Sequence, residues 1–401
     1  MIDPPPPPPS PPIEAVNAPV FSSALLAEVR LASVRGVGPL LRRRLIEAFG
    51  DAERVLRTSP QELTGAPGVG PKLAQAIGAA PDEATARGEL RQAATAGIRP
   101  LVLGTPEYPP RLAQLGDAPP VLYCRGQVAP TDTRAIAIVG TRRASRYGLR
   151  YAGELAAGLA RAGVTVVSGL ARGIDAAAHR ACLEAGGRTL AIMAGGLLKI
   201  YPPEHAELAE AVARRGALLA ESPPRMPPMS GSFPQRNRII SGVSLGVVVV
   251  EAARRSGAMI TARHAAEQDR DVFALPGVID NPQAAGCHQL IQEGAKLITG
   301  VDDILAELET LEACGVIDPR PNAAVGVPVA PDSAPSRSAA LPPLSEVEQR
   351  VWEAIGVGPT AIDTLIDSAG LPAHKVLATV SLLELAGRIE RLSGVMVARR
   401  S

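Results

Sequence analysis

The chain has 401 residues and a formal net charge of +1 at pH 7, a length that predicts roughly two to four domains and a sizeable core. This charge balance neither favours nor excludes a nucleic-acid partner, so such an assignment must rest on local clusters. Four cysteines without a C-x-x-C pair argue against a disulfide framework and a zinc ribbon. No apolar run approaches the ~20 residues of a membrane span. We therefore predict a soluble cytoplasmic protein that does not contact membranes.

The N-terminal region predicts a proline-rich tail and a small helical domain. Residues 1–19 include "MIDPPPPPPSPP" and predict a disordered tail. Within residues 20–90, "RGVGPLLRRRLIEAFG" (35–50) and "GAPGVGPKLAQAI" (65–77) repeat Gly-Val-Gly-Pro before an amphipathic helix. The repeat is similar to a sterile-alpha-motif-like or helix-hairpin-helix domain, whose glycine turn can offer backbone N–H groups to a duplex DNA phosphate. A helical domain with glycine caps and no ligand explains it equally well.

Residues 100–310 alternate strand-like and helix-like stretches. Short apolar runs that do not alternate with polar residues are typical of parallel strands buried on both faces. We expect strands at 135–139, 164–167, 189–193, 217–220, 246–250 and 271–275, and helices that include 148–162, 175–186, 204–215 and 256–268. Repeated strand–helix units predict an α/β fold, an extended Rossmann-like, doubly wound and mostly parallel sheet. Ligands bind such sheets at the carboxyl ends of the strands.

The C-terminal region predicts a linker, 318–343, and a winged-helix-like domain, 344–401. The domain is expected to contain helices 345–355, 360–369 and 373–386 and a two-stranded wing with Ser393 and Gly394 at its tip. The third of these helices carries only His374 and Lys375 as basic side chains. That favours a protein contact over base reading, with duplex DNA contact left open.

Three segments are expected to converge as loops at the carboxyl edge of the sheet. They are "IVGTRRASRYG" (138–148), "VVSGLARGIDAAAHRAC" (166–182) and "SGSFPQRNRIISG" (230–242). Guanidinium forks match phosphate oxygens, and a glycine-rich turn before a helix often holds a phosphate. Phe233 is either a core residue or a stacking platform for an unpaired base. The predicted DNA-binding residues are Arg142, Arg143, Ser168, Gly169, Arg172, Gly173, Phe233, Arg236, Asn237 and Arg238.

The same segments lack the sequence motifs of several enzyme classes. The glycine spacing at 169–173 is not a Walker A loop, and the dinucleotide fingerprint is absent. Ser168, Asp175 and His179 superficially resemble a catalytic set, but no G-x-S-x-G elbow accompanies them. Asp175 can instead cap the helix, and His179 can pack beneath the loop and hold it. Histidines and cysteines lack metal-ligand spacing. We predict a binding protein that is not an enzyme and has no metal or cofactor.

The motifs "AIVGTRRASRYG", "IYPPEHAEL", "SFPQRNRIISGVS" and "RDVFALPG" follow one another in an order that resembles the DNA-processing protein A family (DprA, also called Smf). The resemblance covers roughly residues 100–310. It implies single-stranded DNA binding and a homodimer. It further implies a role in natural transformation, in which incoming single strands are protected and the RecA recombinase is loaded onto them. The pocket residues implied are among those named above, with Glu251, Ser256, Gly257 and Thr261 in structural or pocket-lining positions.

The chain departs from that family's pattern at several places near the pocket. Lys199 follows "GGLL" where an aspartate is usual, and His205 and His288 replace asparagine in "YPPEH" and "GCHQLI". Ala220 replaces a serine before Glu221. These substitutions concern fine specificity, because the arginines of the pocket remain.

Two other hypotheses are kept beside the DNA-binding one. A nucleoside-monophosphate phosphoribohydrolase-like enzyme would also use a Rossmann-like phosphate loop, although the P-G-G-x-G-T stretch of those enzymes is absent here. A winged-helix regulator with a nucleotide-sensing central domain would lose DNA binding when residues 340–401 are deleted. The DNA-binding hypothesis instead predicts that the central domain alone retains DNA binding.

Overall fold

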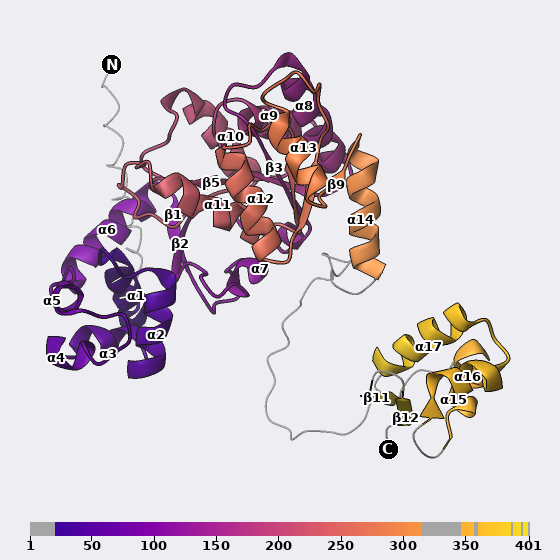
Figure 1. The fold of residues 1–401 in the computed structure, drawn as a ribbon. Coiled ribbons are helices and arrows are strands. Elements are labelled where there is room, and N and C mark those ends of the chain that lie inside the picture. Colours follow the sequence, from indigo (N-terminus) through magenta and orange to yellow (C-terminus); the bar gives the residue numbers. More distant parts are fainter. Residues whose placement is uncertain (1–20, 314–345, 357–359, 386–387, 394–395, 400–401) are drawn as a thin grey trace, which may run out of the picture. The chain divides into compact units, whose positions relative to one another are not determined.

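The structure is a computed structural model that describes residues 21–313, 346–356, 360–385, 388–393 and 396–399. The chain divides into two compact units, Met1–Ala323 and Ala324–Ser401. Figure 1 shows the elements of both units. The predicted tail at 1–19 and the predicted linker at 318–343 lie outside the described residues. Among the described helices, none is long and apolar enough to cross a membrane.

The first unit begins with the predicted helical region. Its helices are α1 (Ser23–Ser33), α2 (Pro39–Phe49), α3 (Ala52–Arg57), α4 (Pro60–Leu63), α5 (Pro71–Gly78) and α6 (Glu83–Thr95). The two Gly-Val-Gly-Pro turns pack reciprocally. A Cβ on Gly36 would lie 3.2 Å from Leu73, and one on Gly68 would lie 3.5 Å from Leu41. Both glycines have positive φ, 99° and 91°, which side chains rarely adopt. The repeat thus builds two hairpins around one shared core.

A sheet of nine strands forms the centre of the first unit. The strands are β1 (Ile98–Val102), β2 (Val121–Gly126), β3 (Ala135–Val139), β4 (Thr165–Ser168), β5 (Thr189–Met193), β6 (Ala217–Ala220), β7 (Gly246–Val249), β8 (Asp271–Ala274) and β9 (Lys296–Leu297). Their order is β1-β2-β6-β5-β4-β3-β7-β8-β9. β2 pairs antiparallel with β1 and β6, and all other pairs are parallel. The mostly parallel, doubly wound sheet is confirmed.

Helices cover both faces of this sheet. Successive side chains of a strand point to opposite faces, so Leu190 and Ile192 of β5 join one core cluster while Ala191 and Met193 join another. One face packs against α8 (Arg146–Arg161), α9 (Ile174–Glu184), α10 (Ala206–Arg215) and α14 (Val301–Ala313). The other packs against α7 (Pro110–Ala113), α11 (Ser232–Gly242), α12 (Gly257–Glu267) and α13 (Ala285–Gln292). Because the chain runs outward from β3 in both directions, the sheet has its switch point beside β3.

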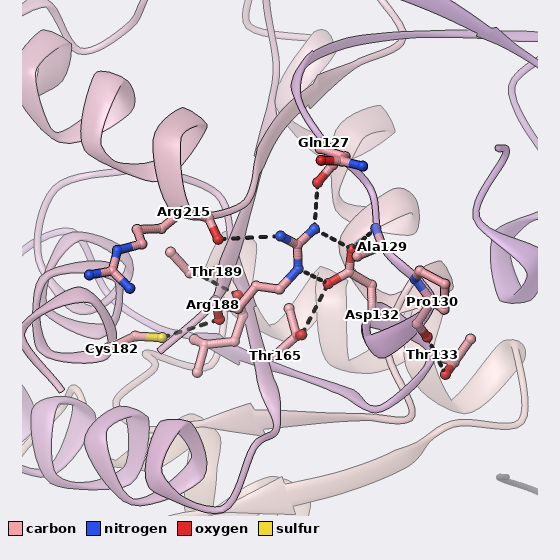
Figure 2. A network of polar contacts seen from close by, with 11 residues as sticks. Gln127, Ala129, Pro130, Asp132, Thr133, Thr165, Cys182, Arg188, Thr189 and Arg215 are labelled. Atoms are coloured by element: carbon pink, nitrogen blue, oxygen red, sulfur yellow. Dashed lines mark hydrogen bonds and ion pairs between the residues drawn. The ribbon is translucent and has the colours of Figure 1, made fainter. Parts of the chain in front are cut away.

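A partly buried ion pair ties the amino-terminal ends of β4 and β5 to the segment before β3 (Figure 2). The guanidinium of Arg188 donates two hydrogen bonds to the carboxylate of Asp132, at 2.6 and 2.7 Å. That carboxylate also accepts from the Thr165 hydroxyl at 3.0 Å and from the Ala129 amide at 2.8 Å. Arg188 further donates to the Gln127 carbonyl. The network lies at the edge opposite the carboxyl ends of the strands.

The second unit has the predicted winged-helix organisation. It contains α15 (Glu346–Ala354), α16 (Ile362–Ala369), α17 (Ala373–Leu385) and the strands β10 (Thr360–Ala361), β11 (Ile389–Ser393) and β12 (Met396–Arg399). β12 pairs antiparallel with both β10 and β11. The predicted wing is the β11–β12 hairpin, and Gly394 of its tip lies outside the described residues.

Candidate nucleic-acid interface

Two adjoining pockets open at the carboxyl ends of β3, β4, β5 and β7. We call them the Tyr201 pocket, a narrow cavity with a volume of about 20 Å³, and the Ser256 pocket, of about 270 Å³. Arg142, Ala171, Phe233 and Arg236 line both pockets. The Tyr201 pocket is further lined by Gly169, Arg172, Met193, Ala194, Gly195, Tyr201, Pro202 and Pro228. The Ser256 pocket is further lined by Val139, Gly140, Thr141, Asp175, Asn237, Ile240, Ser256, Gly257, Ala258 and Thr261.

A cation and an aromatic ring form the boundary between the pockets. The guanidinium carbon of Arg142 lies 4.7 Å from the centroid of the Phe233 ring, within the range of a cation–π contact. The Tyr201 ring meets Phe233 edge-on, with centroids 6.1 Å apart and planes at 65°. Arg142 is exposed, and no described carboxylate forms an ion pair with it. The boundary therefore offers an accessible charge and a half-buried aromatic face.

The third predicted loop is a helix, and this corrects the placement of its arginines. Ser232–Gly242 forms α11, and Pro234 is tolerated in its first turn because the N–H groups there have no intrahelical partner. Phe233, Arg236 and Asn237 are three and four residues apart, so they share the face that lines the pockets. Arg238 points elsewhere. Its guanidinium makes two 2.7 Å contacts with Glu221 and donates to the Asp117 carbonyl at 2.6 Å. The contact of Arg238 with DNA stays a prediction, and in this structure its side chain holds α11 to the body of the domain.

Arg236 lies at the floor of both pockets. Its side chain is buried, and its Nη1 donates to the carbonyl of Gly169 at 2.6 Å and to that of Ile192. Burial lowers the pKa of Arg236 to about 10, the charge of Asp175 opposes that shift, and Arg142 adds to it. The side chain therefore stays protonated at neutral pH. Its hydrogen bonds link the carboxyl ends of β4 and β5. Its guanidinium contributes positive charge to the lining of both pockets.

The glycine-rich stretch after β4 does not present the free amides that its sequence suggests. The carboxylate of Asp175 accepts hydrogen bonds from the amides of Gly169 at 3.1 Å and Ala171 at 3.3 Å. Burial raises the pKa of Asp175, while Arg236 and these two amides oppose the rise. The chain's own carboxylate thus occupies the position that the sequence assigned to a phosphate. The charge that remains available comes from arginine side chains.

Ser168 and the two predicted glycines have structural roles in this stretch. Ser168 is fully buried and donates to the Ile138 carbonyl at 2.6 Å, which links β4 to β3, and its contact with DNA stays a prediction. A Cβ on Gly169 would overlap the guanidinium of Arg236, and one on Gly173, where φ is +77°, would overlap the Thr141 carbonyl. These glycines permit the close approaches that bring the arginine-bearing segments together.

The remaining predicted residues differ in how they face the pockets. Arg172 is exposed at the Tyr201 pocket and pairs with Glu204 at 2.5 Å. Asn237 lines the Ser256 pocket and donates to the Gly257 carbonyl at 3.0 Å. Arg143 is exposed but lines neither pocket, and only its amide contacts the Thr141 hydroxyl, at 3.2 Å.

Sequence reasoning missed most of the apolar lining. Met193, Pro202 and Pro228 shape the Tyr201 pocket, and no local pattern marks them because they come from three separate segments. Tyr201 had a weaker signal as one of the chain's few aromatic residues. At the Ser256 pocket, the Ser256 hydroxyl is buried and has no hydrogen-bond partner among the described residues.

Of two buried histidines in this region, His205 supports the loop after β4, whereas His179, predicted to pack beneath that loop, contacts the start of β5. His205 contacts the carbonyl of Leu170 through Nδ1 at 2.9 Å, and Leu170 has a φ of 57°. The departure at His205 therefore serves the backbone of the loop. His179 contacts the Thr189 hydroxyl through Nδ1 at 2.7 Å, and that hydroxyl donates to the Val166 carbonyl. Nδ1 must then carry the proton, which leaves Nε2 as a buried acceptor without a partner in the described structure.

His179 makes the stability of the first unit depend on pH. Burial, together with the charges of Arg236 and His205, lowers its pKa from 6.5 to about 3. Between these values the unfolded chain binds a proton that the folded chain does not, so stability falls as the pH falls. We expect a loss of up to about 1.4 kcal/mol per pH unit from this group between roughly pH 6 and pH 4.

The measurement is urea unfolding followed by circular dichroism across this pH range. Because the raised pKa of Asp175 acts in the opposite direction, the informative quantity is the difference in slope between wild type and His179→Leu. His264→Leu, at the surface of α12 beside Glu267, is the control. Equal slopes for wild type and His179→Leu would show that His179 is protonated in the folded state.

The doubly wound sheet, with arginines and an aromatic ring at its carboxyl edge, defines a Rossmann-like α/β protein whose cationic surface lies where such folds bind ligands. Comparison with known proteins narrows the class. The family model of DNA recombination-mediator protein A matches residues 99–309, the DprA winged helix domain matches 335–395, and a SAM-like helix-hairpin-helix tandem matches 28–79. The chain belongs to the DNA-processing protein A (DprA/Smf) family.

Relatives support this assignment over most of the chain. Protein Smf of Escherichia coli K12 is 41% identical over 297 residues, which cover 73% of this chain and 75% of that protein. Protein Smf of Synechocystis is 33% identical over 389 residues, 92% of this chain and 96% of that protein. The X-ray structure of DNA processing protein A from Streptococcus pneumoniae superposes with a TM-score of 0.63 at 32% identity, covering 72% of this chain and 98% of that one.

Proposed function

We propose that the central domain binds single-stranded DNA across the two pockets and does not alter it chemically. In this proposal the protein acts in natural transformation, where it protects incoming strands and loads the RecA recombinase onto them. The observation that carries the proposal is the Arg142–Phe233 boundary. One exposed cation and one aromatic face lie side by side between two cavities. Proteins that bind single strands without reading sequence combine these same two elements.

The mouth of the Tyr201 pocket, rather than its narrow interior of about 20 Å³, is suited to stacking of an unpaired base. Apolar and aromatic groups line it, among them Met193, Tyr201 and Phe233, and stacking on such rings tolerates any base. The charges stand at its edge, where Arg142 is free of ion pairs with described residues and Arg172 is held by Glu204. A phosphate of the same strand therefore lies against Arg142 while its base stacks at the mouth of the pocket. A duplex would have to unpair or flip a base to reach this position, which costs a few kcal/mol.

The absence of chemical alteration is supported by the three residues that resembled a catalytic set. Ser168 bonds to a backbone carbonyl, Asp175 accepts loop amides, and His179 contacts Thr189. Among the described contacts, none of the three hydrogen-bonds to another. A nucleophile needs a base within hydrogen-bond reach, so this arrangement favours structural roles for all three. The nucleotide-processing alternative then has no assigned nucleophile at this place.

The test is a competition assay with the full chain. A labelled oligothymidylate is displaced by unlabelled single strand or by duplex of the same length, over a series of salt concentrations. We expect single strand to compete at least about ten-fold more effectively, because only unpaired bases can stack at the mouth of the pocket. Equal competition by duplex would refute the proposal. Release of adenine from AMP, followed by chromatography, would instead establish the enzyme hypothesis.

Dimerisation and RecA loading belong to the same proposal and draw on the family resemblance. The edge strand β9 exposes Lys296 and Leu297 and gives the sheet an unpaired border in the described structure, which is one way in which two sheets can join. Sedimentation of the full chain tests the dimer. Strand exchange by RecA on coated single strands, with and without this protein, tests loading.

A further inference from the structure

A second surface lies beside the Ser256 pocket, and its first part is a loop that exposes two apolar side chains. Val278 is 70% exposed and Ile279 is 88% exposed. The loop is fixed in place from several sides. The Tyr147 hydroxyl donates to the Pro276 carbonyl at 2.8 Å, His288 Nε2 lies 3.0 Å from the Gly277 carbonyl oxygen, and Asn281 donates to Glu251 at 3.3 Å. Single exposed apolar residues are ordinary, but two neighbours held at the tip of a buttressed loop indicate a contact surface.

The second part is the start of α8, which carries positive charge and aromatic rings. Arg146 and Arg150 are four residues apart on the helix and therefore neighbours. The rings of Tyr147 and Tyr151 lie 4.5 Å apart, and Arg150 stacks over Tyr151 at 4.7 Å. No acidic residue occurs between positions 134 and 153. The Glu154 contact of Arg150, at 3.4 Å, is exposed on both sides and adds little. Because the Arg150–Glu154 pair neutralises only one of these arginines, the cluster keeps a net positive charge that fits an anionic partner.

Two features connect this surface to the Ser256 pocket. They are the backbone that runs from Arg142 to α8 and the buried carboxylate of Glu251. Arg142 lines the Ser256 pocket, and Arg143 follows it toward α8. Glu251 accepts from the amide and hydroxyl of Ser145, which caps α8, at 2.9 and 2.6 Å. The same carboxylate accepts from Asn281 of the loop. The start of α8 and the exposed loop are therefore fixed to one point beside the pocket.

We propose that single-stranded DNA leaving the Ser256 pocket continues over this surface, which we call the α8 surface: Arg143, Arg146, Tyr147, Arg150, Val278 and Ile279. The inference rests on the proposed function. A single strand presents phosphates and flat, partly apolar bases together, and the α8 surface places arginines beside aromatic and aliphatic side chains. A duplex would match the charge but would leave the apolar tip without a partner. The two pockets then hold the first nucleotides, and the α8 surface holds those that follow.

The test compares a short oligothymidylate, about six nucleotides, with a long one of about 25, using the full chain. For the double variant R146A/R150A, we expect about ten-fold weaker binding of the long strand and a shallower salt slope, by about 0.7 per lost phosphate contact. Binding of the short strand should not change. The double variant V278S/I279S should weaken only the long strand, with an unchanged salt slope. Arg161→Ala, an exposed arginine in the last turn of α8, is the matched control.

The outcomes separate this inference from the proposed function. If Arg142→Ala weakens both strands while R146A/R150A behaves like Arg161→Ala, the α8 surface is refuted and the pockets stand. If Arg142→Ala has no effect on either strand, the proposed function itself fails. A loss of equal size for short and long strands in R146A/R150A would also overturn the inference. It would show that the two arginines act through long-range electrostatic attraction of DNA and not through contacts with nucleotides beyond the pockets. If V278S/I279S changes the oligomeric state and not DNA binding, the loop contacts protein and the DNA assignment is wrong.

Discussion

Replacing Arg142 with alanine is expected to weaken binding of single-stranded DNA by about 10- to 100-fold, the effect of losing a charge-assisted contact of about 1.5–3 kcal/mol. The side chain is exposed, lines both pockets and stacks on Phe233. Its removal takes away a phosphate contact and the cation that orients the aromatic face. Anisotropy of a labelled oligothymidylate at a fixed salt concentration of about 0.1 M gives the dissociation constant, because affinities of this kind depend steeply on salt.

Arg172 is the matched control for this prediction. It is also an exposed arginine, but it lines only the Tyr201 pocket and is paired with Glu204. We expect Arg172→Ala to weaken binding by no more than about three-fold, since part of its charge is already compensated. Arg142→Lys should fall between wild type and Arg142→Ala, because lysine keeps the charge but not the planar fork. Equal losses for Arg142→Ala and Arg172→Ala would show that only the summed charge matters and that the boundary with Phe233 has no special role.

The parallel part of the sheet could be predicted because its strands are buried on both faces and contain little but apolar residues. All six expected strands are present, with ends that differ by at most one residue. The antiparallel extension by β1 and β2 was not predicted. Pro100 within β1 argues against a strand from local sequence alone, yet proline is tolerated on an edge strand, which β1 is. The place of β1 in the sheet is decided by its pairing with β2, and local sequence does not show this pairing.

The types of residue that line the site could be predicted from the sequence, but the directions in which their side chains point could not. Phe233, Arg236 and Arg238 all come from one short motif, and the motif does not say that they lie on a helix. Once α11 is formed, two residues of separation are enough to turn Arg238 toward Glu221 while Arg236 faces the pockets. The prediction that Asp175 caps its helix is wrong, because the N-cap of α9 is Gly173, and the Asp175 carboxylate instead accepts from the amides of Gly169 and Ala171. The hydrogen bonds between the Asp175 carboxylate and the loop amides depend on the backbone conformation of residues 169–175. The spacing of residues in the sequence does not reveal this conformation.

Replacing Asp132 with alanine is expected to destabilise the first unit by about 2–4 kcal/mol, which is somewhat less than the loss for a fully buried pair because Arg188 is partly exposed. The carboxylate is the common acceptor for Arg188, Thr165 and the Ala129 amide (Figure 2). Without it, a half-buried guanidinium loses its counter-charge, and two further donors lose their acceptor. The amino-terminal ends of β4 and β5 are then no longer fixed to the segment before β3.

The chain carries its own internal reference for this measurement. Its one tryptophan, Trp352, belongs to the second unit, so fluorescence follows that unit while circular dichroism follows the helices of both. In Asp132→Ala we expect the circular dichroism transition to move down by about 5–15 °C, with the Trp352 transition unchanged. Glu154→Ala removes a carboxylate from an exposed pair and should cost no more than about 0.5 kcal/mol. If the Trp352 transition moved together with the first, the two units would unfold as one, and if neither moved, the Asp132 network would contribute nothing to stability.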